Sequence, residues 1–132
     1  MLRGSCLCGK VRYEARGIPK VAYYCHCGRC RKQSGSSFAT NMAVRREGFV
    51  VVSGEELLSY YQSSAQLRRY FCSECGSPIY SQSDKYKHIV AVRCGTLDSD
   101  LLVRPSVHAF VASKANWVDI SDELPQFPEY FA

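Results

Sequence analysis

Eight cysteines in a chain of 132 residues constrain the fold more than any other feature of this sequence. Seven of them fall into the three tight groups Cys6-x-Cys8, Cys25-x-Cys27-x-x-Cys30 and Cys72-x-x-Cys75. Neighbours so close in sequence are poorly placed for long-loop disulfides, whereas thiolates paired on short turns are typical ligands of zinc. The spacing therefore favours metal sites over a disulfide framework.

The compartment expected from the sequence agrees with metal binding. The segment Met1–Cys6 has no apolar stretch that would serve as a signal peptide, and no later segment has the length and hydrophobicity of a membrane span. We therefore expect a cytoplasmic protein, in a reducing environment that keeps cysteines available to metal. The length suits one domain, which we expect to cover residues 1–132.

Short runs of alternating or β-branched residues dominate the chain and predict a mainly β fold of small sheets. The predicted strands cover residues 10–15, 21–25, 38–44, 49–53, 57–62, 67–71, 79–82, 88–93 and 107–111. Residues 29–34 alone have the signals of a helical turn, ended by Gly35. We expect residues 121–132 to form irregular surface chain. A set of aromatic residues should lie mostly in the core, with one or two of them lining the site instead: Phe38, Tyr60, Tyr61, Tyr70, Phe71, Phe110 and Trp117.

Two of the cysteine groups are followed by a glycine, in Cys6-Leu7-Cys8-Gly9 and Cys72-Ser73-Glu74-Cys75-Gly76. Such a glycine lets backbone amides turn toward the sulfurs, as in a zinc knuckle. Tetrahedral zinc usually takes four thiolates as two pairs from two turns. We therefore predict a closed structural site of Cys6, Cys8, Cys72 and Cys75. An alternative remains open, in which the groups at 25–30 and 72–75 share one metal and the first pair binds none.

The middle group supplies three sulfurs, from Cys25, Cys27 and Cys30, and no obvious fourth ligand. Three protein ligands and one open position are the usual composition of a catalytic zinc. Two local residues are candidates for the fourth ligand. His26 lies between two ligands and should point to the opposite side of an extended chain, and Cys94 lies in an apolar run where a small buried cysteine is more typical. We expect neither to complete the site.

The formal charge is +5, from 17 basic and 12 acidic residues, and Arg29, Arg31 and Lys32 flank the middle group. These side chains suit an anionic ligand. They suit equally well the compensation of the negative charge that several thiolates give to a bound zinc. Nucleic acid is the less favoured partner, because the charges are scattered and not interleaved with aromatic residues.

The cysteine groups and their surroundings resemble those of the glutathione-dependent formaldehyde-activating enzymes, a domain shared with centromere protein V. The similar segments span nearly the whole chain and are Gly4–Tyr13, Cys25–Gly35, Phe71–Ser77, Gly95–Asp98, His108–Ala115 and Trp117. The resemblance implies small β-sheets organised around zinc, similar to methionine sulfoxide reductase B. It also implies two zinc ions, a structural one on Cys6, Cys8, Cys72 and Cys75 and a catalytic one on Cys25, Cys27 and Cys30.

The namesake activity of that family implies condensation of glutathione with formaldehyde to S-(hydroxymethyl)glutathione, a carbon-sulfur lyase reaction in reverse. On this hypothesis the open position binds the glutathione sulfur as a thiolate, and Arg29, Arg31 and Lys32 anchor its carboxylates. The expected partners are thus a small thiol and a small aldehyde. The alternatives are the same thiol chemistry on another substrate, or a non-catalytic zinc module that binds protein or nucleic acid. The oligomeric state is not predicted.

Two positions depart from the family pattern. Ala109 follows His108 where the family often has a bulkier aliphatic residue, and Cys94 stands where a small residue is usual. Both changes bear on the shape of a pocket rather than on the zinc ligands. We expect His108 itself to be a packed strand histidine rather than a group that orients the ligand or transfers a proton.

Overall fold

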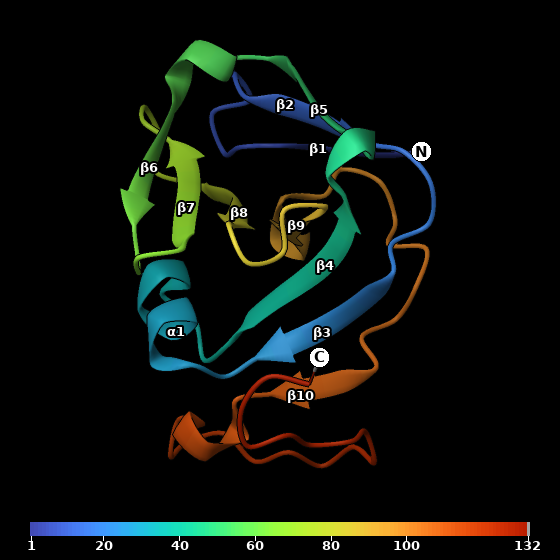
Figure 1. Cartoon of the computed structure of the whole chain (residues 1–132), viewed down its shortest axis with the longest axis vertical. Coiled ribbons are helices and arrows are strands. Elements are labelled where there is room, and N and C mark those ends of the chain that lie inside the picture. Colours follow the sequence, from blue (N-terminus) through green and yellow to red (C-terminus); the bar gives the residue numbers. More distant parts are fainter. Residues whose placement is uncertain (132) are drawn as a thin grey trace.

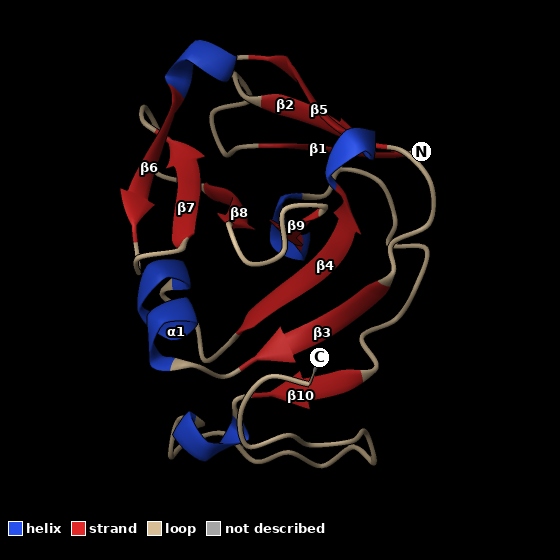
Figure 2. Ribbon diagram, in the orientation of Figure 1, coloured by secondary structure: helices blue, strands red, loops and turns tan. Residues whose placement is uncertain are grey.

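A computed structural model describes residues 1–131, and most of its regular structure is short strands (Figures 1 and 2). The strands are β1 (Leu2–Ser5), β2 (Arg12–Ala15), β3 (Val21–Cys25), β4 (Ala39–Arg45), β5 (Phe49–Ser53), β6 (Leu58–Gln62), β7 (Leu67–Cys72), β8 (Pro78–Ser83), β9 (Ile89–Arg93) and β10 (Val107–Ala109). Within the described residues the α-helix is α1 (Gly28–Ser34), and short 3-10 helices cover Arg46–Gly48, Glu55–Leu57, Cys94–Thr96 and Val111–Ser113. The predicted mainly β fold is confirmed.

The strands form two sheets. The smaller has the order β1-β2-β5, and the larger has the order β10-β3-β4-β9-β8-β7-β6. Neighbouring strands are antiparallel except for β10, which pairs in parallel with β3. In Figure 1 the smaller sheet lies at the top, β4, β3 and β10 cross the lower half, and α1 stands beside the end of β3.

A common core joins the two sheets. Leu2 and Tyr13 of the smaller sheet are buried against Met42, Ile79 and Val92 of the larger one. Complete burial of an apolar side chain of this size contributes about 1.5–3 kcal/mol. This interface therefore fixes the smaller sheet on the larger one. A second, smaller cluster lies around β3, α1 and β10 and consists of Tyr23, Cys25, Cys30, Ala39 and Ala109.

The short helix forms where the sequence predicts one. Cys27 is its N-cap, and the Cys27 Sγ accepts a hydrogen bond from the backbone N–H of Cys30 at 3.2 Å. Gly35 ends the helix with a φ of 65°, in the left-handed region that favours glycine. The cap places one cysteine at the start of α1 and another in its first turn, which sets the spacing of their sulfurs.

The strand β1 is absent from the sequence prediction. It is short and contains Gly4, a residue that weakens strands. The glycine is required here because a Cβ atom at this position would overlap the ring of Tyr13 on the paired strand. Gly4 therefore weakens the sequence signal for β1, and the same glycine allows β1 to pack against the ring of Tyr13.

The expectation that the aromatic residues lie mostly in the core is wrong for three of them. Tyr60, Tyr61 and Trp117 are exposed. The two tyrosines belong to β6, the edge strand of the larger sheet, whose residues from Ser59 to Gln62 are all exposed. An alternating pattern does not reveal whether its apolar face meets a second layer.

The chain after Ser121 contains no strand up to Phe131, as expected, although Gln126 forms an isolated bridge to His108. No helix within residues 1–131 has the length and hydrophobicity needed to cross a membrane. The expectation of a single domain over residues 1–132 stays a prediction.

Candidate functional site

The first cysteine site joins two turns that are far apart in sequence. The sulfurs of Cys6, Cys8, Cys72 and Cys75 all lie within 4.8 Å of one another. The Cys6–Cys8 and Cys8–Cys72 Sγ distances are 3.5 Å and 3.9 Å. A tetrahedron with zinc–sulfur bonds of about 2.3 Å has sulfurs about 3.8 Å apart, so this donor set fits zinc. The structure thus brings together the pairs predicted from the following glycines, and not the alternative grouping.

Hydrogen bonds around these sulfurs shape the turns. The backbone N–H of Val11 donates to the Cys6 Sγ at 3.3 Å. The Cys75 Sγ and the Ser77 Oγ are 3.3 Å apart, and this hydrogen bond lowers the pKa of Cys75 to about 5. Gly76 adopts a φ of 80°, which the tight turn needs. The turn therefore favours the thiolate form that a metal site requires.

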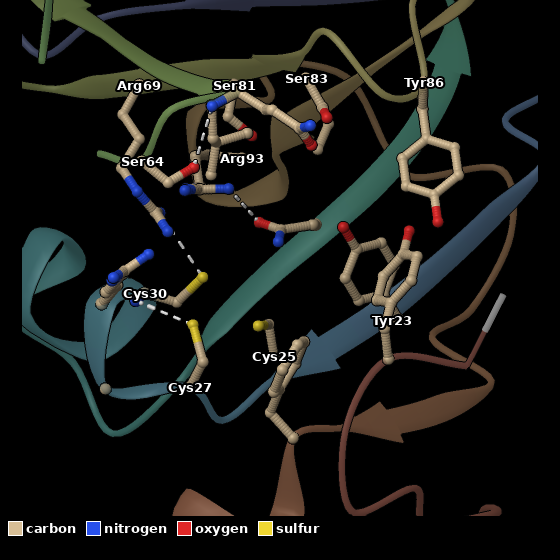
Figure 3. Close-up of a pocket in the computed structure, with 18 of the residues that line it drawn as sticks. Tyr23, Cys25, Cys27, Cys30, Ser64, Arg69, Ser81, Ser83, Tyr86 and Arg93 are labelled. Atoms are coloured by element: carbon tan, nitrogen blue, oxygen red, sulfur yellow. Dashed lines mark hydrogen bonds between the residues drawn. The ribbon is translucent and has the colours of Figure 1, made fainter. Parts of the chain in front are cut away.

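The second cysteine site comes from one short segment. Cys25 is the last residue of β3, Cys27 caps α1 and Cys30 lies within it, and their three sulfurs lie within 4.8 Å of one another (Figure 3). Within residues 1–131 no fourth Cys, His, Asp or Glu joins this group. The donor set fits a zinc with three protein ligands and one position for another ligand. That zinc binds at either site stays a prediction.

Two buried arginines reach the second site from the larger sheet. Arg69 of β7 and Arg93 of β9 are only 5% and 6% exposed. The Arg69 Nη1 donates to the Cys30 Sγ at 3.6 Å, and both guanidinium groups donate to the Gln33 Oε1, at 3.2 Å and 3.0 Å. Arg93 also donates to the Asn41 Oδ1 at 2.7 Å. Neither arginine forms an ion pair with a carboxylate of the described residues, so their charge is available to thiolates or to an anionic ligand.

The pKa values of two cysteines in the cluster are shifted in opposite directions. Hydrogen bonds from Cys25 and Cys27 lower the pKa of Cys30 far below its ordinary value, and the positive charges of Arg93 and Arg69 lower it further. Hydrogen bonding to Cys27 and Cys30, together with burial, raises the pKa of Cys25. The two arginines therefore favour the thiolate form of Cys30.

The three sulfurs open onto a cavity of about 820 Å³, a size typical of small-molecule sites. No carboxylate occurs among the described residues that line it. The cationic side chains in its wall are Arg29, Arg31, Lys32, Arg69, Lys85 and Arg93. A wall with charge of one sign raises the local concentration of ligands of the opposite sign. The cavity therefore suits an anion.

The basic residues predicted as ligand contacts all lie on α1 along this cavity. Arg29 and Lys32 are exposed. Arg31 is engaged elsewhere, because its Nη1 donates to the Ser113 carbonyl at 3.1 Å and its guanidinium lies 5.9 Å from the centre of the Trp117 ring. The helix thus offers two free cations at the rim, and its third cation ties α1 to the chain after β10.

The two histidines near the cluster contact each other rather than the sulfurs. The His26 Nε2 lies 2.8 Å from the His108 Nδ1, and the His108 Nε2 lies 3.0 Å from the Asp122 Oδ2. Burial, and then the charge of His108, lower the pKa of His26, which favours its neutral form. Neither histidine lines the cavity. Cys94 packs against the core between the sheets and lies outside both cysteine sites.

Comparison with known proteins identifies the family. Residues 1–113 match the family described as glutathione-dependent formaldehyde-activating enzyme. The chain belongs to this family. A relative from Halomonas elongata that carries the family name is 33% identical over 128 residues, which are 91% of this chain and 81% of the relative.

Two further comparisons extend this result. A family-named relative from Aspergillus flavus is 26% identical over 124 residues, and the aligned part covers 92% of this chain but only 56% of the fungal protein. A crystal structure of a Rhodobacter sphaeroides protein superposes with a TM-score of 0.64 and 27% identity, covering 78% of this chain and 91% of the other. The fold of this chain is therefore similar to that of an experimentally determined structure.

Proposed function

We propose that this chain adds glutathione to formaldehyde to give S-(hydroxymethyl)glutathione, the activity that its family name indicates. In the reverse direction the reaction is that of a carbon-sulfur lyase. The observation that carries the proposal is the cavity itself, which places three cysteine sulfurs beneath a wall whose charged groups are all cationic. Glutathione combines a thiol with two carboxylates, so one molecule matches both features.

A zinc ion held by the three sulfurs would supply a Lewis acid that favours the thiolate form of an incoming thiol. The residues of the chain provide the binding and the charge. Arg29 and Lys32 at the rim attract the glutathione carboxylates, and Arg69 beside Cys30 stabilises negative charge on an arriving sulfur. In the reaction a carbon–sulfur bond forms, the carbonyl π bond breaks, and the thiol proton ends on the carbonyl oxygen.

The test measures a rate of exchange, because thiols and formaldehyde also combine without a catalyst. NMR exchange spectroscopy on an equilibrium mixture of glutathione and ¹³C-formaldehyde gives the rate constant for adduct formation and breakdown. We expect this constant to increase in proportion to the concentration of zinc-loaded wild-type protein. Cys27→Ala should return it to the protein-free value, whereas Cys94→Ala, outside both cysteine sites, should behave as wild type. Equal rates with and without zinc-loaded wild-type protein would refute the proposal.

A further inference from the structure

The cavity has two chemically different sides. Figure 3 shows Cys27, Cys30 and Arg69 on one side of the view and Tyr23 and Tyr86 on the other, with Cys25 between them. The first side carries the sulfurs and the buried positive charge described above. The second side is aromatic, and the cation beside it is Lys85, whose Nζ lies 5.6 Å from the centre of the Tyr86 ring.

Four aromatic side chains, the aromatic wall, meet on that second side: Tyr23, Tyr86, Phe110 and Tyr130 all line the cavity. Tyr130 joins the other three, with ring centres 6.2 Å from Tyr23, 6.1 Å from Tyr86 and 6.3 Å from Phe110. Tyr23 is buried, whereas the other three keep part of their surface accessible. Edge-to-face and tilted ring pairs of this kind leave aromatic surface that another ring can cover.

The backbone of Phe110 is strained in a way that shapes this wall. Among the described residues it is the one non-glycine residue with a positive φ, at 58°. A bulky side chain rarely adopts this conformation, and such strain persists where the surrounding structure imposes it, often at a binding site. The backbone N–H of Phe110 donates to the Glu129 carbonyl at 3.0 Å, and that of Val111 donates to the Phe127 carbonyl at 3.0 Å. The segment 127–130 thus holds the strained turn.

That same segment supplies Tyr130, and it lies beyond the residues that match the family, which end at residue 113. One stretch of chain therefore fixes Phe110 and completes the aromatic wall. Formaldehyde has a single carbon atom, and its apolar surface is too small to contact four aromatic rings. Phe110 and Tyr130 pack against the cluster that contains Cys25, so an aromatic group on a sulfur bound at the cysteines could reach the wall and bury apolar surface there.

We propose that the aromatic wall binds the ring of an aldehyde that carries an aromatic group, so that the preferred electrophile of this chain is such an aryl-bearing aldehyde rather than formaldehyde. The inference rests on the proposed function, because it assigns the second substrate of the same site. The thiol adds across the carbonyl group to form a thiohemiacetal. The carbon–sulfur bond forms, the carbonyl π bond breaks and the thiol proton ends on oxygen, so no oxidant or reductant takes part.

A binding experiment tests the wall without any reaction. Isothermal titration calorimetry with the zinc-loaded protein compares S-benzylglutathione with S-methylglutathione, which differ only in the aromatic ring. We expect the benzyl conjugate to bind at least tenfold more tightly to wild type. Tyr130→Ala should reduce this ratio to less than threefold, and Tyr86→Ala should also lower it. Tyr61→Ala, which removes an exposed tyrosine of β6 outside the cavity, should keep the wild-type ratio.

A ratio of affinities is insensitive to a general weakening of the protein, and the two wall variants serve as independent checks if one of them folds poorly. Equal affinities of wild type for the two conjugates would overturn the inference. A ratio that survives both wall variants would overturn it as well.

The exchange assay then separates this inference from the proposed function. With phenylacetaldehyde and formaldehyde at equal concentration, we expect wild type to accelerate the aromatic exchange at least tenfold more, relative to the protein-free rates. Acceleration of the formaldehyde reaction alone overturns this inference and leaves the proposed function standing. A preference for the benzyl conjugate without acceleration of either aldehyde would show that the wall binds a ring, and it would overturn both the proposed function and the assignment of the aldehyde.

Discussion

The closed cysteine site should carry a large share of the stability, and a double variant tests this. Cys8→Ser with Cys75→Ser removes one sulfur from each turn, at an exposed and at a half-buried position, so little packing is lost. The remaining Cys6 and Cys72 cannot form a tetrahedral site on their own. A zinc ion at this site would link residues that are 64 positions apart in sequence, as between Cys8 and Cys72. By the chain-entropy relation for a cross-link, closing a loop of this length stabilises the fold by about 4 kcal/mol.

The assay is urea unfolding at equal protein concentration, combined with zinc analysis of each sample. With an m-value of about 2 kcal/mol/M, the double variant should unfold at a midpoint lower by about 2 M. Cys27→Ser is the matched control from the second site, because serine is a good N-cap and can still accept the hydrogen bond from the backbone of Cys30. It should lose one zinc and, because the cap is kept, change the free energy of unfolding by less than about 1 kcal/mol.

Two results would refute this reasoning. One is a double variant that has lost its zinc and still unfolds at the wild-type midpoint, since the cross-link would then contribute nothing. The other is a Cys27→Ser protein as destabilised as the double variant, since the second site would then hold the fold as strongly as the first. Cys94→Ser checks that the loss of a thiol outside both sites has little effect on the midpoint.

Two further predictions concern the folded state. Gly4→Ala should lower the free energy of unfolding by about 2 kcal/mol, because the added Cβ would overlap the buried ring of Tyr13. The control Gly28→Ala, at the start of α1, should leave the free energy of unfolding unchanged or raise it by up to about 1 kcal/mol, and urea midpoints measure both effects. The hydrogen bond from His108 lowers the pKa of Asp122 below its ordinary value of 3.8, so its carboxylate stabilises the fold above that pH and loses this effect as the pH falls through the lowered pKa. The difference in stability between wild type and Asp122→Asn should shrink toward zero as the pH falls below about 4; a difference that grows there would contradict the assignment.

The strands could be predicted because the preference for a strand depends largely on the residues within the strand itself. Val21–Cys25 and Phe49–Ser53 form strands over the predicted residues, since β-branched and aromatic side chains suit a pleated, half-buried surface. The short helix followed equally from its glycine stop. A local sequence pattern does not show which part of the chain packs against a strand. Gly4 is typical of a break in a strand, and only the contact with the ring of Tyr13 shows why a glycine is needed there. The tyrosines of β6 have the pattern of core residues, and only the strand order shows that β6 is an edge strand.

Of the site, only the cysteine groups could be predicted. Spacing and the following glycines favoured the grouping that the structure brings together over the alternative, since each turn can aim two sulfurs at one point. Arg69 and Arg93 were missed because their approach to Cys30 depends on the order of strands in the larger sheet. The available signal was a charged residue at the end or in the middle of an apolar strand with no acidic neighbour. Tyr130 had no signal, because the irregular segment that carries it has no period to follow.

The two cysteine groups offer the same donor atom, and the fold makes different sites of them. The first site takes its sulfurs from turns 64 residues apart, so its four ligands meet only when both sheets are assembled. The second takes all its sulfurs from six consecutive residues whose geometry is fixed by the end of β3 and by the cap of α1. Because the local backbone already holds the second group, a coordination position there can be left to a ligand without loosening the fold. We therefore propose Cys25, Cys27 and Cys30 as the place of the chemistry, because exchange of a ligand would least disturb the fold there.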